Sequence, residues 1–426
     1  MKKYDVLVCG GGFAGVGAAI AAARQGASVL LVESSNALGG AAVNCLVNPF
    51  MPYTTKVNGE RFYLSAGIFS EICDELIKLT HELDGIDARY ASKPMSTFSE
   101  EYLKIVLNRM TLASGVELLF HTSVVGVRRE GRRLRSVIVS NIGGLSEIEA
   151  NCFIDCSGDA SLAVQAGYPT RLGRDEDRLC QPMTLCFRVG DVNVDLFMKS
   201  REYMQKRYKE LQAEGKIKNI REDVLLFRTT SDNVIHFNTT RIVKRNPIDP
   251  LDVTAAEIEV REQVYEMFRF LKTEVPGCEN ARLLSTAMHI GVRESRMIDG
   301  EYLLTKDDLL AYRHFEDGIA ACNYDIDIHN PEGSGTSHFY FPDGCYYTIP
   351  YRCLIPRGSE NLLVAGRCIS STHEAQASYR IMPTVCTLGE AAGVAAALTV
   401  RGSSGVSQID VSELRRLLRE NGAVVD

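Results

Sequence analysis

The first part of the chain alternates between short apolar runs and stretches with helical periodicity. Residues 4–9 form an apolar run that leads into a glycine-rich turn; an alanine-rich segment follows, and a second apolar run covers 28–32. A short apolar run bounded by glycines is typical of a buried strand, and the alanine-rich segment is typical of a helix. The order strand, turn, helix, strand predicts a parallel βαβ unit.

The pattern further along predicts elements of both kinds. Apolar residues at helical spacing predict helices at 60–83 and 99–114, the second beginning behind Ser99. Near the C-terminus, Pro383 suits the first turn of another alanine-rich helix. Four strands are predicted, two of them joined by a hairpin: 116–120, 123–129, 134–139 and 148–154.

The character of the pattern changes at about residue 168. Two long charged helices are predicted at 191–215 and 254–275, and Thr254 with Glu257 gives the second a capping-box pattern. Predicted strands in this region are 185–189, 224–229, 233–238 and 283–290. We therefore predict an α/β fold in which an antiparallel α+β substrate domain interrupts a Rossmann-like domain, with the boundaries 1–168 and 355–426 for the Rossmann-like part and 169–354 for the insertion.

Three glycines in the first turn carry the strongest chemical signal. Gly10, Gly12 and Gly15 have the GxGxxG spacing between a strand and a helix, the context in which this motif binds a dinucleotide. Gly10 permits the tight turn, Gly12 lets backbone approach a pyrophosphate, and Gly15 lets helix and strand pack closely. The phosphates would meet free N–H groups at the positive end of the helix. Glu33 ends the second strand, where a carboxylate accepts hydrogen bonds from a ribose diol, so the chain is predicted to bind an adenine dinucleotide.

Three later segments favour FAD over NAD. Gly39-Gly40 resembles the second contact loop of FAD proteins with the glutathione-reductase-type fold, and Gly158-Asp159 resembles the turn that returns the chain to the flavin. Gly366-Arg367 leads to a helix N-terminus that would face the flavin pyrimidine ring, and Arg367 would offer positive charge to the pyrophosphate or the flavin carbonyls. The other residues predicted to contact FAD are Phe13, Ala14, Ser34, Ala41, Val124, Ile381 and Met382.

Composition and charge narrow the class of protein. The 426 residues are 45% hydrophobic and 24% charged, as in an ordinary globular protein. The net charge of −7 argues against a nucleic-acid-binding surface. Because the first strand begins at Tyr4, and the apolar stretches at 14–23 and 389–400 are too short for a bilayer, we expect a cytoplasmic protein with no signal peptide and no membrane span.

The thirteen cysteines predict neither a metal site nor an iron–sulfur cluster, because no CxxC spacing occurs. The segment 39–47 resembles that of disulfide reductases, in which two cysteines follow the glycine pair. Ala42 and Val47 stand at those positions here, so the dithiol is missing. Cys45 is interpreted as a packing residue, with a place at the flavin as the alternative.

Five further segments resemble one family over nearly the whole chain: 181–184, 291–296, 327–331, 349–352 and 363–367. It is the family of bacterial FAD-dependent oxidoreductases, which is more distantly similar to the succinate dehydrogenase and fumarate reductase flavoproteins. The resemblance implies FAD and redox chemistry, but it implies no particular substrate.

Two arginines are candidates for substrate contact. Arg293 and Arg296 follow the predicted strand 283–290 and lie three residues apart, so on a helical turn they would share a face. A pair of guanidiniums suits bidentate binding of a carboxylate. We predict a catalytic role for Arg293 and substrate binding for Arg296; the alternatives are ion pairs with Glu294, Asp299 or Glu301, or a contact with the flavin.

Two histidines and a Tyr-Arg pair complete the candidates. His329 lies in an irregular segment near Asp327 and is predicted to be a general base, with a hydrogen bond inside its own turn as the alternative. His373 follows the Gly-Arg loop and is a further catalytic candidate. Tyr351 and Arg352 are predicted to bind substrate, and packing against the next strand is their alternative role.

The predicted function is hydride transfer between flavin N5 and a small organic substrate, with a carboxylated one favoured by the arginines. Flavin carries the hydride, and the protein orients substrate and moves protons. A monooxygenase that uses NAD(P)H is an alternative; no second GxGxxG occurs, so NAD(P)H would have to enter the substrate site directly. A non-redox flavoprotein, such as an isomerase or hydratase, is the alternative from another class. The electron donor or acceptor, covalent attachment of FAD and a homodimeric state are left open.

Overall fold

The N-terminal pattern folds into the expected βαβ unit. In the computed structural model, which describes residues 3–86, 88 and 90–426, β1 (Lys3–Cys9) runs parallel to β2 (Val29–Val32), and α1 (Phe13–Arg24) connects them. All four residues of β2 are buried. This burial on both faces explains why the strand is a continuous apolar run rather than an alternating one.

A long strand, β8 (Gly144–Asp155), joins a parallel and an antiparallel half of the main sheet. Its C-terminal half runs parallel to β1 on one side and to β19 (Leu362–Val364) on the other. Its N-terminal half pairs antiparallel with β7 (Arg133–Asn141). The sheet order is β5-β2-β1-β8-β7-β6, with β19 beside β8, where β5 is Glu117–Leu119 and β6 is Ser123–Glu130. The prediction of a mixed α/β fold is confirmed.

Helix α11 (Met382–Gly402) packs directly on α1 through glycines. A Cβ built on Gly389 would lie 1.9 Å from the Ala14 carbonyl oxygen, and one on Gly393 would lie 2.2 Å from that of Ala18. These two helices therefore touch backbone to backbone. The apolar segment is longer than the predicted 389–400, and by length α11 could cross a membrane; however, 89% of its apolar window is buried inside the protein, as in a core helix.

The helix predicted at 60–83 is wrong in its first turns. Residues Thr54–Val57 (β3) and Glu60–Tyr63 (β4) form a hairpin, and α3 covers only Ile68–Asp84. Asn58 and Gly59 between the strands both have positive φ, as the Asn-Gly hairpin turn requires. The next helix, α4 (Glu100–Ala113), is confirmed, with the Ser99 hydroxyl accepting from the Tyr102 N–H.

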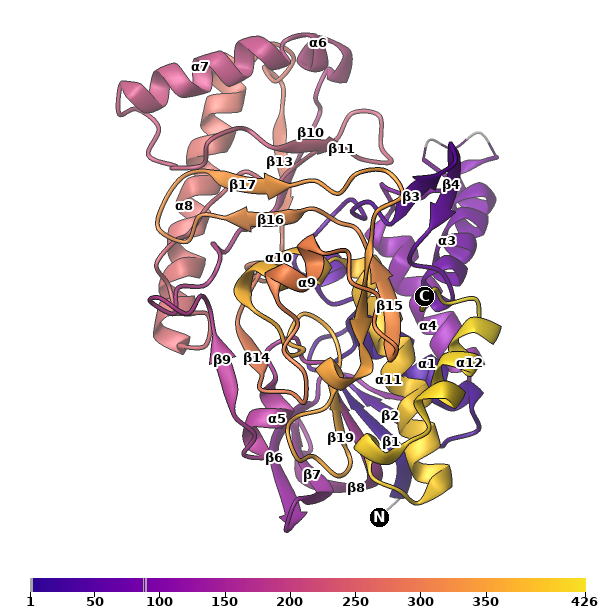
Figure 1. Ribbon diagram of the computed structural model, residues 1–426. Coiled ribbons are helices and arrows are strands. Elements are labelled where there is room, and N and C mark those ends of the chain that lie inside the picture. Colours follow the sequence, from indigo (N-terminus) through magenta and orange to yellow (C-terminus); the bar gives the residue numbers. More distant parts are fainter. Residues whose placement is uncertain (1–2, 87, 89) are drawn as a thin grey trace.

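Residues 183–292 surround a second hydrophobic core. Four antiparallel strands in the order β11-β12-β10-β13 carry helices α6, α7 and α8 at the end of the molecule away from the N-terminus (Figure 1). The strands are β10 (Phe187–Gly190), β11 (Leu226–Arg228), β12 (Ile235–Phe237) and β13 (Arg282–Thr286). Four residues of the edge strand β13 are exposed, so the predicted apolar strand 283–290 is shorter than expected and its leucines lie on the surface.

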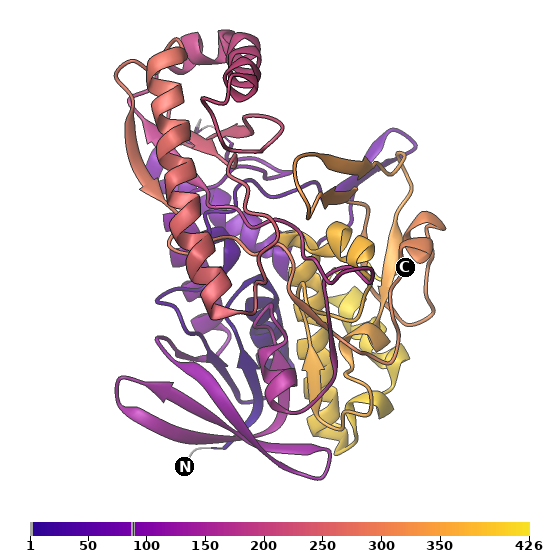
Figure 2. The same cartoon turned by 90° about the vertical axis from the view of Figure 1, so that its left-hand side faces the viewer.

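Two helix boundaries in this part differ from the prediction. The segment 191–215 forms two helices, α6 (Val194–Lys199) and α7 (Arg201–Ala213), which are separated at Ser200. Helix α8 (Pro250–Glu274) begins four residues before the predicted Thr254, because Asp249 caps it and Pro250 occupies its first turn. Figure 2 shows α8 along the outer edge of the molecule.

Two short antiparallel strand pairs lie in the sequence between the second core and β19. Strand β15 (Gly318–Cys322) pairs with β18 (Tyr347–Pro350), and β16 (Ile326–His329) pairs with β17 (Thr336–Phe339) beside α10 (His373–Tyr379). Buried residues from 304–355 belong to the same hydrophobic cluster as β1. The predicted domain boundaries stay a prediction. The remaining elements are α2 (Ala41–Asn44), α5 (Ser161–Gln165), β9 (Thr170–Leu172), β14 (Arg296–Ile298), α9 (Lys306–Leu310), α12 (Val411–Glu420) and short 3-10 turns at Tyr351–Leu354 and Val406–Gln408.

Candidate functional site

The first glycine turn is closed on one side and open on the other. Gly10 has φ of +101°, and a Cβ on it would lie 2.5 Å from the Cys156 carbonyl oxygen. A Cβ on Gly15 would lie 1.8 Å from the Gly10 carbonyl oxygen. On Gly12, by contrast, the nearest atom within the described chain would be Gly40 Cα at 3.8 Å. Only Gly12 therefore leaves room beside the N-terminus of α1, where a pyrophosphate binds in such turns.

Glu33 lies against this turn, as predicted for the ribose-binding carboxylate. Its buried side chain accepts hydrogen bonds from the Gly11 N–H at 2.6 Å and from the Ser35 N–H at 2.7 Å, and the Ser34 hydroxyl lies 3.2 Å away. The Gly39 N–H donates to the Gly11 carbonyl at 2.8 Å. This bond joins the second glycine loop to the first.

The Gly158-Asp159 and Gly366-Arg367 turns meet across the carboxyl ends of β8 and β19. Gly158 and Gly366 have φ of +80° and +111°, which favour glycine. Arg367 donates to Asp159 at 2.8 Å, and in the described structure its buried Nε makes no hydrogen bond. A buried guanidinium nitrogen without an acceptor fits a site that binds an anionic or carbonyl-rich cofactor.

The other predicted cofactor contacts occupy varied surroundings. Ile381 caps α11 and Met382 begins it, so the free N–H groups of that helix start there. The Phe13 ring packs with Phe50 at 5.5 Å, which leaves only its backbone for the cofactor. The Val124 carbonyl accepts from Gln165 at 3.1 Å. Ala14 lies against Gly366, and Ala41 begins α2 directly after the glycine pair.

Arg293 is a half-buried cation held by neutral groups. Its guanidinium donates to the Pro182 carbonyl and the Thr184 hydroxyl, both at 2.6 Å, and to Asn238 at 3.5 Å. No carboxylate among the described residues forms an ion pair with it. Burial, and then the positive charge of Arg380, lowers the pKa of Arg293. An anionic ligand would relieve this cost, because a desolvated cation needs a counter-charge.

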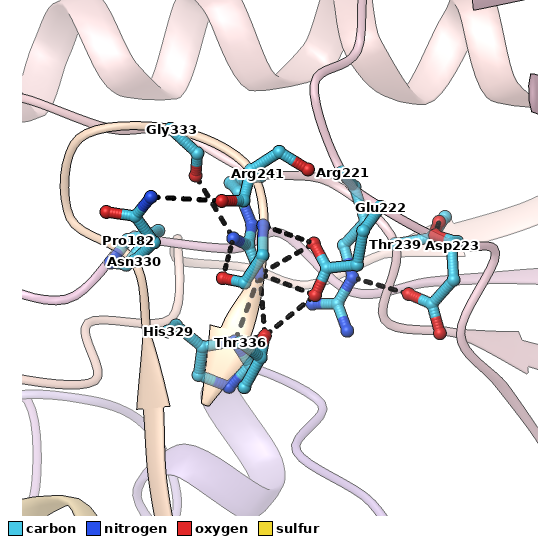
Figure 3. Close-up of polar contacts among 12 residues, drawn as sticks. Pro182, Arg221, Glu222, Asp223, Thr239, Arg241, His329, Asn330, Gly333 and Thr336 are labelled. Atoms are coloured by element: carbon cyan, nitrogen blue, oxygen red, sulfur yellow. Dashed lines mark hydrogen bonds and ion pairs between the residues drawn. The ribbon is translucent and has the colours of Figure 1, made fainter. Parts of the chain in front are cut away.

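Arg241, which is 1% exposed, holds His329 (Figure 3). The guanidinium donates to the carbonyls of Gly333 at 3.1 Å and Gly335 at 2.8 Å, and it pairs with Glu222 at 3.1 Å. It also lies 3.1 Å from His329 Nδ1. The loop between β16 and β17 is thereby tied to the second core.

This contact fixes the protonation of His329. A guanidinium has only donors, so Nδ1 accepts and the imidazole proton lies on Nε2, which is 3.4 Å from Asp327 Oδ2. Burial, followed by the charge of Arg293, lowers the pKa of His329 to about 3. His329 is therefore neutral near pH 7, and its Nε2–H is directed to Asp327.

His373 belongs to a buried hydrogen-bond network at the start of α10. Its Nδ1 lies 2.8 Å from Glu294 Oε1, and the other oxygen of Glu294 accepts from the Gln181 N–H at 2.8 Å. The Gln181 side chain bonds Gln376 at 3.2 Å, and Gln376 donates to the Arg293 carbonyl at 2.8 Å. The network places His373 and Arg293 on one framework.

The other predicted substrate residues do not join this group. Arg296 lies in β14 rather than on a helical turn with Arg293, so the shared helical face is wrong; its Nε donates to the Asp159 carbonyl at 2.9 Å. The Tyr351 hydroxyl is buried and donates to the Val406 carbonyl at 2.7 Å. Arg352 is exposed and pairs with Asp317 at 2.8 Å.

Two arginines at the site carried no signal in the sequence. Arg241 follows two threonines in a polar segment, and its partners lie near residues 222 and 329–336. Arg380 donates to the Asp327 carbonyl at 3.2 Å and lies 3.7 Å from Asp327 Oδ2. Both positions depend on contacts between distant segments, so no local spacing could have indicated them.

Comparisons with known proteins show the family of this chain. The model of the family described as "FAD dependent oxidoreductase" matches residues 5–418. Among curated proteins, glutathione reductase of Debaryomyces hansenii is 44% identical over 69 residues, which are 16% of this chain and 14% of that protein. The chain thus matches about a seventh of the length of that relative.

The fold also has counterparts among solved structures. A geranylgeranyl bacteriochlorophyll reductase-like protein of Thermoplasma acidophilum has a TM-score of 0.50 and 14% identity, and the match covers 99% of this chain and 84% of that one. For p-nitrophenol 4-monooxygenase of Pseudomonas putida DLL-E4 the TM-score is 0.45 with 12% identity, over 100% and 82% of the chains. At this identity the likeness to the first structure concerns the fold alone, and nothing is concluded from the second. Because the family model spans nearly the whole chain, the chain belongs to the FAD-dependent oxidoreductase family, and FAD is its cofactor.

Proposed function

We propose that this flavoprotein exchanges a hydride with a small carboxylated organic molecule that binds at Arg293. The supporting observation is the guanidinium itself, which is half-buried and, among the described residues, donates only to neutral oxygens. Arg380 and Arg241 lie nearby but are engaged with Asp327 and Glu222, respectively. Arg293 is therefore the cation best placed to bind a substrate anion.

The cofactor supplies hydride transfer at its N5 atom. In the proposal, Arg293 binds the substrate carboxylate and fixes its orientation. His329, held neutral by burial and by the charge of Arg293, directs its Nε2–H to Asp327 and so positions the carboxylate that pairs with Arg380. His373, whose Nδ1 is oriented by Glu294, is the candidate for proton transfer.

The proposed architecture is of the glutathione-reductase type. Support comes from the βαβ unit, from the return of β8 and β19 to its carboxyl edge, and from the separate core formed by 183–292. In this proposal Pro182, Thr184 and Asn238, which are sequence neighbours of residues in the second core, hold Arg293 at the substrate site.

A binding titration with charged and neutral analogues tests the proposal. Propionate and succinate are compared with propionamide and succinamide, and binding is followed by the change in the flavin absorbance spectrum. The carboxylates should bind saturably and the amides should not. In Arg293→Gln the carboxylate affinity should fall about 10- to 100-fold, the effect of losing a charge-assisted hydrogen bond.

Arg293→Lys is the matched control. It keeps the charge but loses the planar fork, so carboxylate affinity should lie between those of wild type and Arg293→Gln. Equal binding of amide and carboxylate, or unchanged affinity in Arg293→Gln at full FAD content, would overturn the proposal.

A further inference from the structure

The β16–β17 hairpin gathers three groups of the kind that bind metal ions. Asp327 in β16 stands opposite His338 in β17, and Asp325 comes two residues before Asp327. Because side chains alternate along a strand, these residues lie on one face of the hairpin. One ligand atom from each of the three residues lies within 4.8 Å of the other two.

The distances show how the three groups face one another. His338 Nδ1 lies 2.5 Å from Asp325 Oδ2 and 3.8 Å from Asp327 Oδ1. The His338 ring also stacks on Tyr340, with centroids 5.4 Å apart and an interplanar angle of 6°. The Tyr340 ring thus orients the imidazole, while Nδ1 faces the two carboxylates.

One oxygen of Asp327 is unused although the residue is buried. Asp327 is 8% exposed, and in the part of the chain that the structure describes its Oδ1 accepts no hydrogen bond. Its other oxygen, Oδ2, accepts from the Tyr324 hydroxyl at 3.1 Å and lies 3.7 Å from Arg380. A buried carboxylate oxygen without a partner is costly, and here it points toward His338.

We propose that Asp325, Asp327 and His338 bind one divalent transition-metal ion of the Zn²⁺ class, through Asp325 Oδ2, Asp327 Oδ1 and His338 Nδ1. Two carboxylate oxygens and one imidazole nitrogen suit Zn²⁺, whereas Mg²⁺ and Ca²⁺ prefer oxygen alone. Arg380 lies at the other oxygen of Asp327 and offsets one of the two negative charges of the carboxylates. The second negative charge remains to attract a cation. His338 is partly exposed, which leaves water access to the remaining coordination positions.

The ion would join β16 to β17 next to the functional site. Asp327 carries both a proposed ligand atom and the contacts to His329 and Arg380. A metal bound to Oδ1 would hold the hairpin in the position in which Arg241 reaches His329. This role is independent of the substrate proposed for Arg293.

Calorimetric titration of the chelator-treated, FAD-loaded protein with Zn²⁺ tests the site. Wild type should bind one Zn²⁺ per chain, and Mg²⁺ should bind far more weakly. His338→Ala and Asp325→Asn should each weaken Zn²⁺ binding at least about tenfold. His314→Ala is the matched control, since His314 is an exposed histidine that contacts only the Tyr346 backbone and ring among the described residues, and its substitution should leave binding unchanged.

Thermal unfolding supplies a second measurement. Zn²⁺ should raise the unfolding temperature of wild type and of His314→Ala, because a ligand of the native state stabilises it, and should not raise that of His338→Ala or Asp325→Asn. Absence of saturable Zn²⁺ binding in wild type would overturn the proposal. Stoichiometric binding that survives both ligand substitutions would also overturn it, because the ion would then belong to other groups, such as the partly exposed thiols of Cys45 and Cys345.

Discussion

Gly12 and Gly15 lie one helical turn apart, but a methyl group at each would meet different surroundings. At Gly15 it would lie 1.8 Å from the Gly10 carbonyl oxygen, whereas at Gly12 its nearest neighbour in the described structure lies at 3.8 Å. We expect Gly12→Ala to fold normally and to lose FAD, with affinity reduced about tenfold or more, because the methyl group occupies the side on which the pyrophosphate approaches. The flavin-to-protein absorbance ratio and thermal unfolding of the apoprotein measure the two effects.

Gly15→Ala is the comparison. Its methyl group has no space between α1 and β1, so this variant should be destabilised even without FAD. Full FAD retention in Gly12→Ala would show that the pyrophosphate does not lie against this glycine.

Glu390 in α11 gives a residue-level prediction for pH. It is completely buried; one oxygen accepts from the Ile68 N–H at 3.1 Å, and burial raises its pKa to about 8. A carboxyl group with a raised folded-state pKa holds its proton in the native state but releases it in the unfolded state, so its contribution to stability falls as pH rises from about 4.5 to about 8. Glu390→Gln should remove this dependence.

The measurement is the free energy of unfolding of both proteins across that pH range. Wild type should lose stability relative to Glu390→Gln as pH rises, with no further change above about pH 9. A constant difference between the two proteins would show that Glu390 does not titrate in this range.

The candidate cofactor residues were easier to place from the sequence than the residues around Arg293 and His329. Gly10, Gly12, Gly15 and Glu33 act within one βαβ unit, so their spacing along the chain corresponds to their arrangement in space. His329 depends on Arg241, 88 residues away. The sequence predicts His329 in an irregular segment, which is wrong, because His329 is the last residue of strand β16. Only the fold shows that a guanidinium takes its Nδ1 lone pair.

At the scale of elements, the predicted helix boundaries were wrong where a local turn or capping signal competed with the helical spacing of apolar residues. The Asn58-Gly59 turn marks a hairpin, but the predicted helix extends the apolar spacing that begins at Ile68 back to residue 60, across β4. Helix 99–114 was predicted correctly because Ser99 and the periodic apolar face indicate the same start. In α8, two starting signals conflict, Asp249-Pro250 and Thr254-Glu257, and the structure uses the first.

This choice of cap in α8 is testable. The Asp249 side chain accepts from the Leu251 N–H at 2.8 Å, whereas the Thr254 hydroxyl donates to the Pro250 carbonyl inside the helix. Asp249→Ala should therefore lower the free energy of unfolding by about 1 kcal/mol, and Thr254→Ala should cost clearly less. Chemical denaturation of the two variants measures the difference; the reverse order would place the helix start at Thr254.

At the scale of the whole molecule, the site is a meeting of distant segments. The Arg293 side chain donates to the Pro182 carbonyl, next to the second core. The Arg293 backbone carbonyl accepts from the side chain of Gln376 in α10. Figure 1 shows the β16–β17 hairpin between the four-stranded sheet and α10. The sequence could therefore predict the cofactor and the general fold, but not which polar groups would surround Arg293 and His329.

Anaerobic flavin reduction and reoxidation test the central claim most directly. In one experiment, oxidised holoenzyme is mixed with small hydroxy and saturated carboxylic acids, or with NAD(P)H. In the other, dithionite-reduced enzyme is mixed with unsaturated carboxylic acids. The flavin absorbance is followed in both. We predict that a carboxylate bleaches or restores the flavin without NAD(P)H, and that this second-order rate falls about 10- to 100-fold in Arg293→Gln. The contrary result has three parts: only NAD(P)H bleaches the flavin, only oxygen with a neutral substrate restores it, and Arg293→Gln changes neither rate. This result would contradict hydride exchange with a carboxylate and would indicate a monooxygenase.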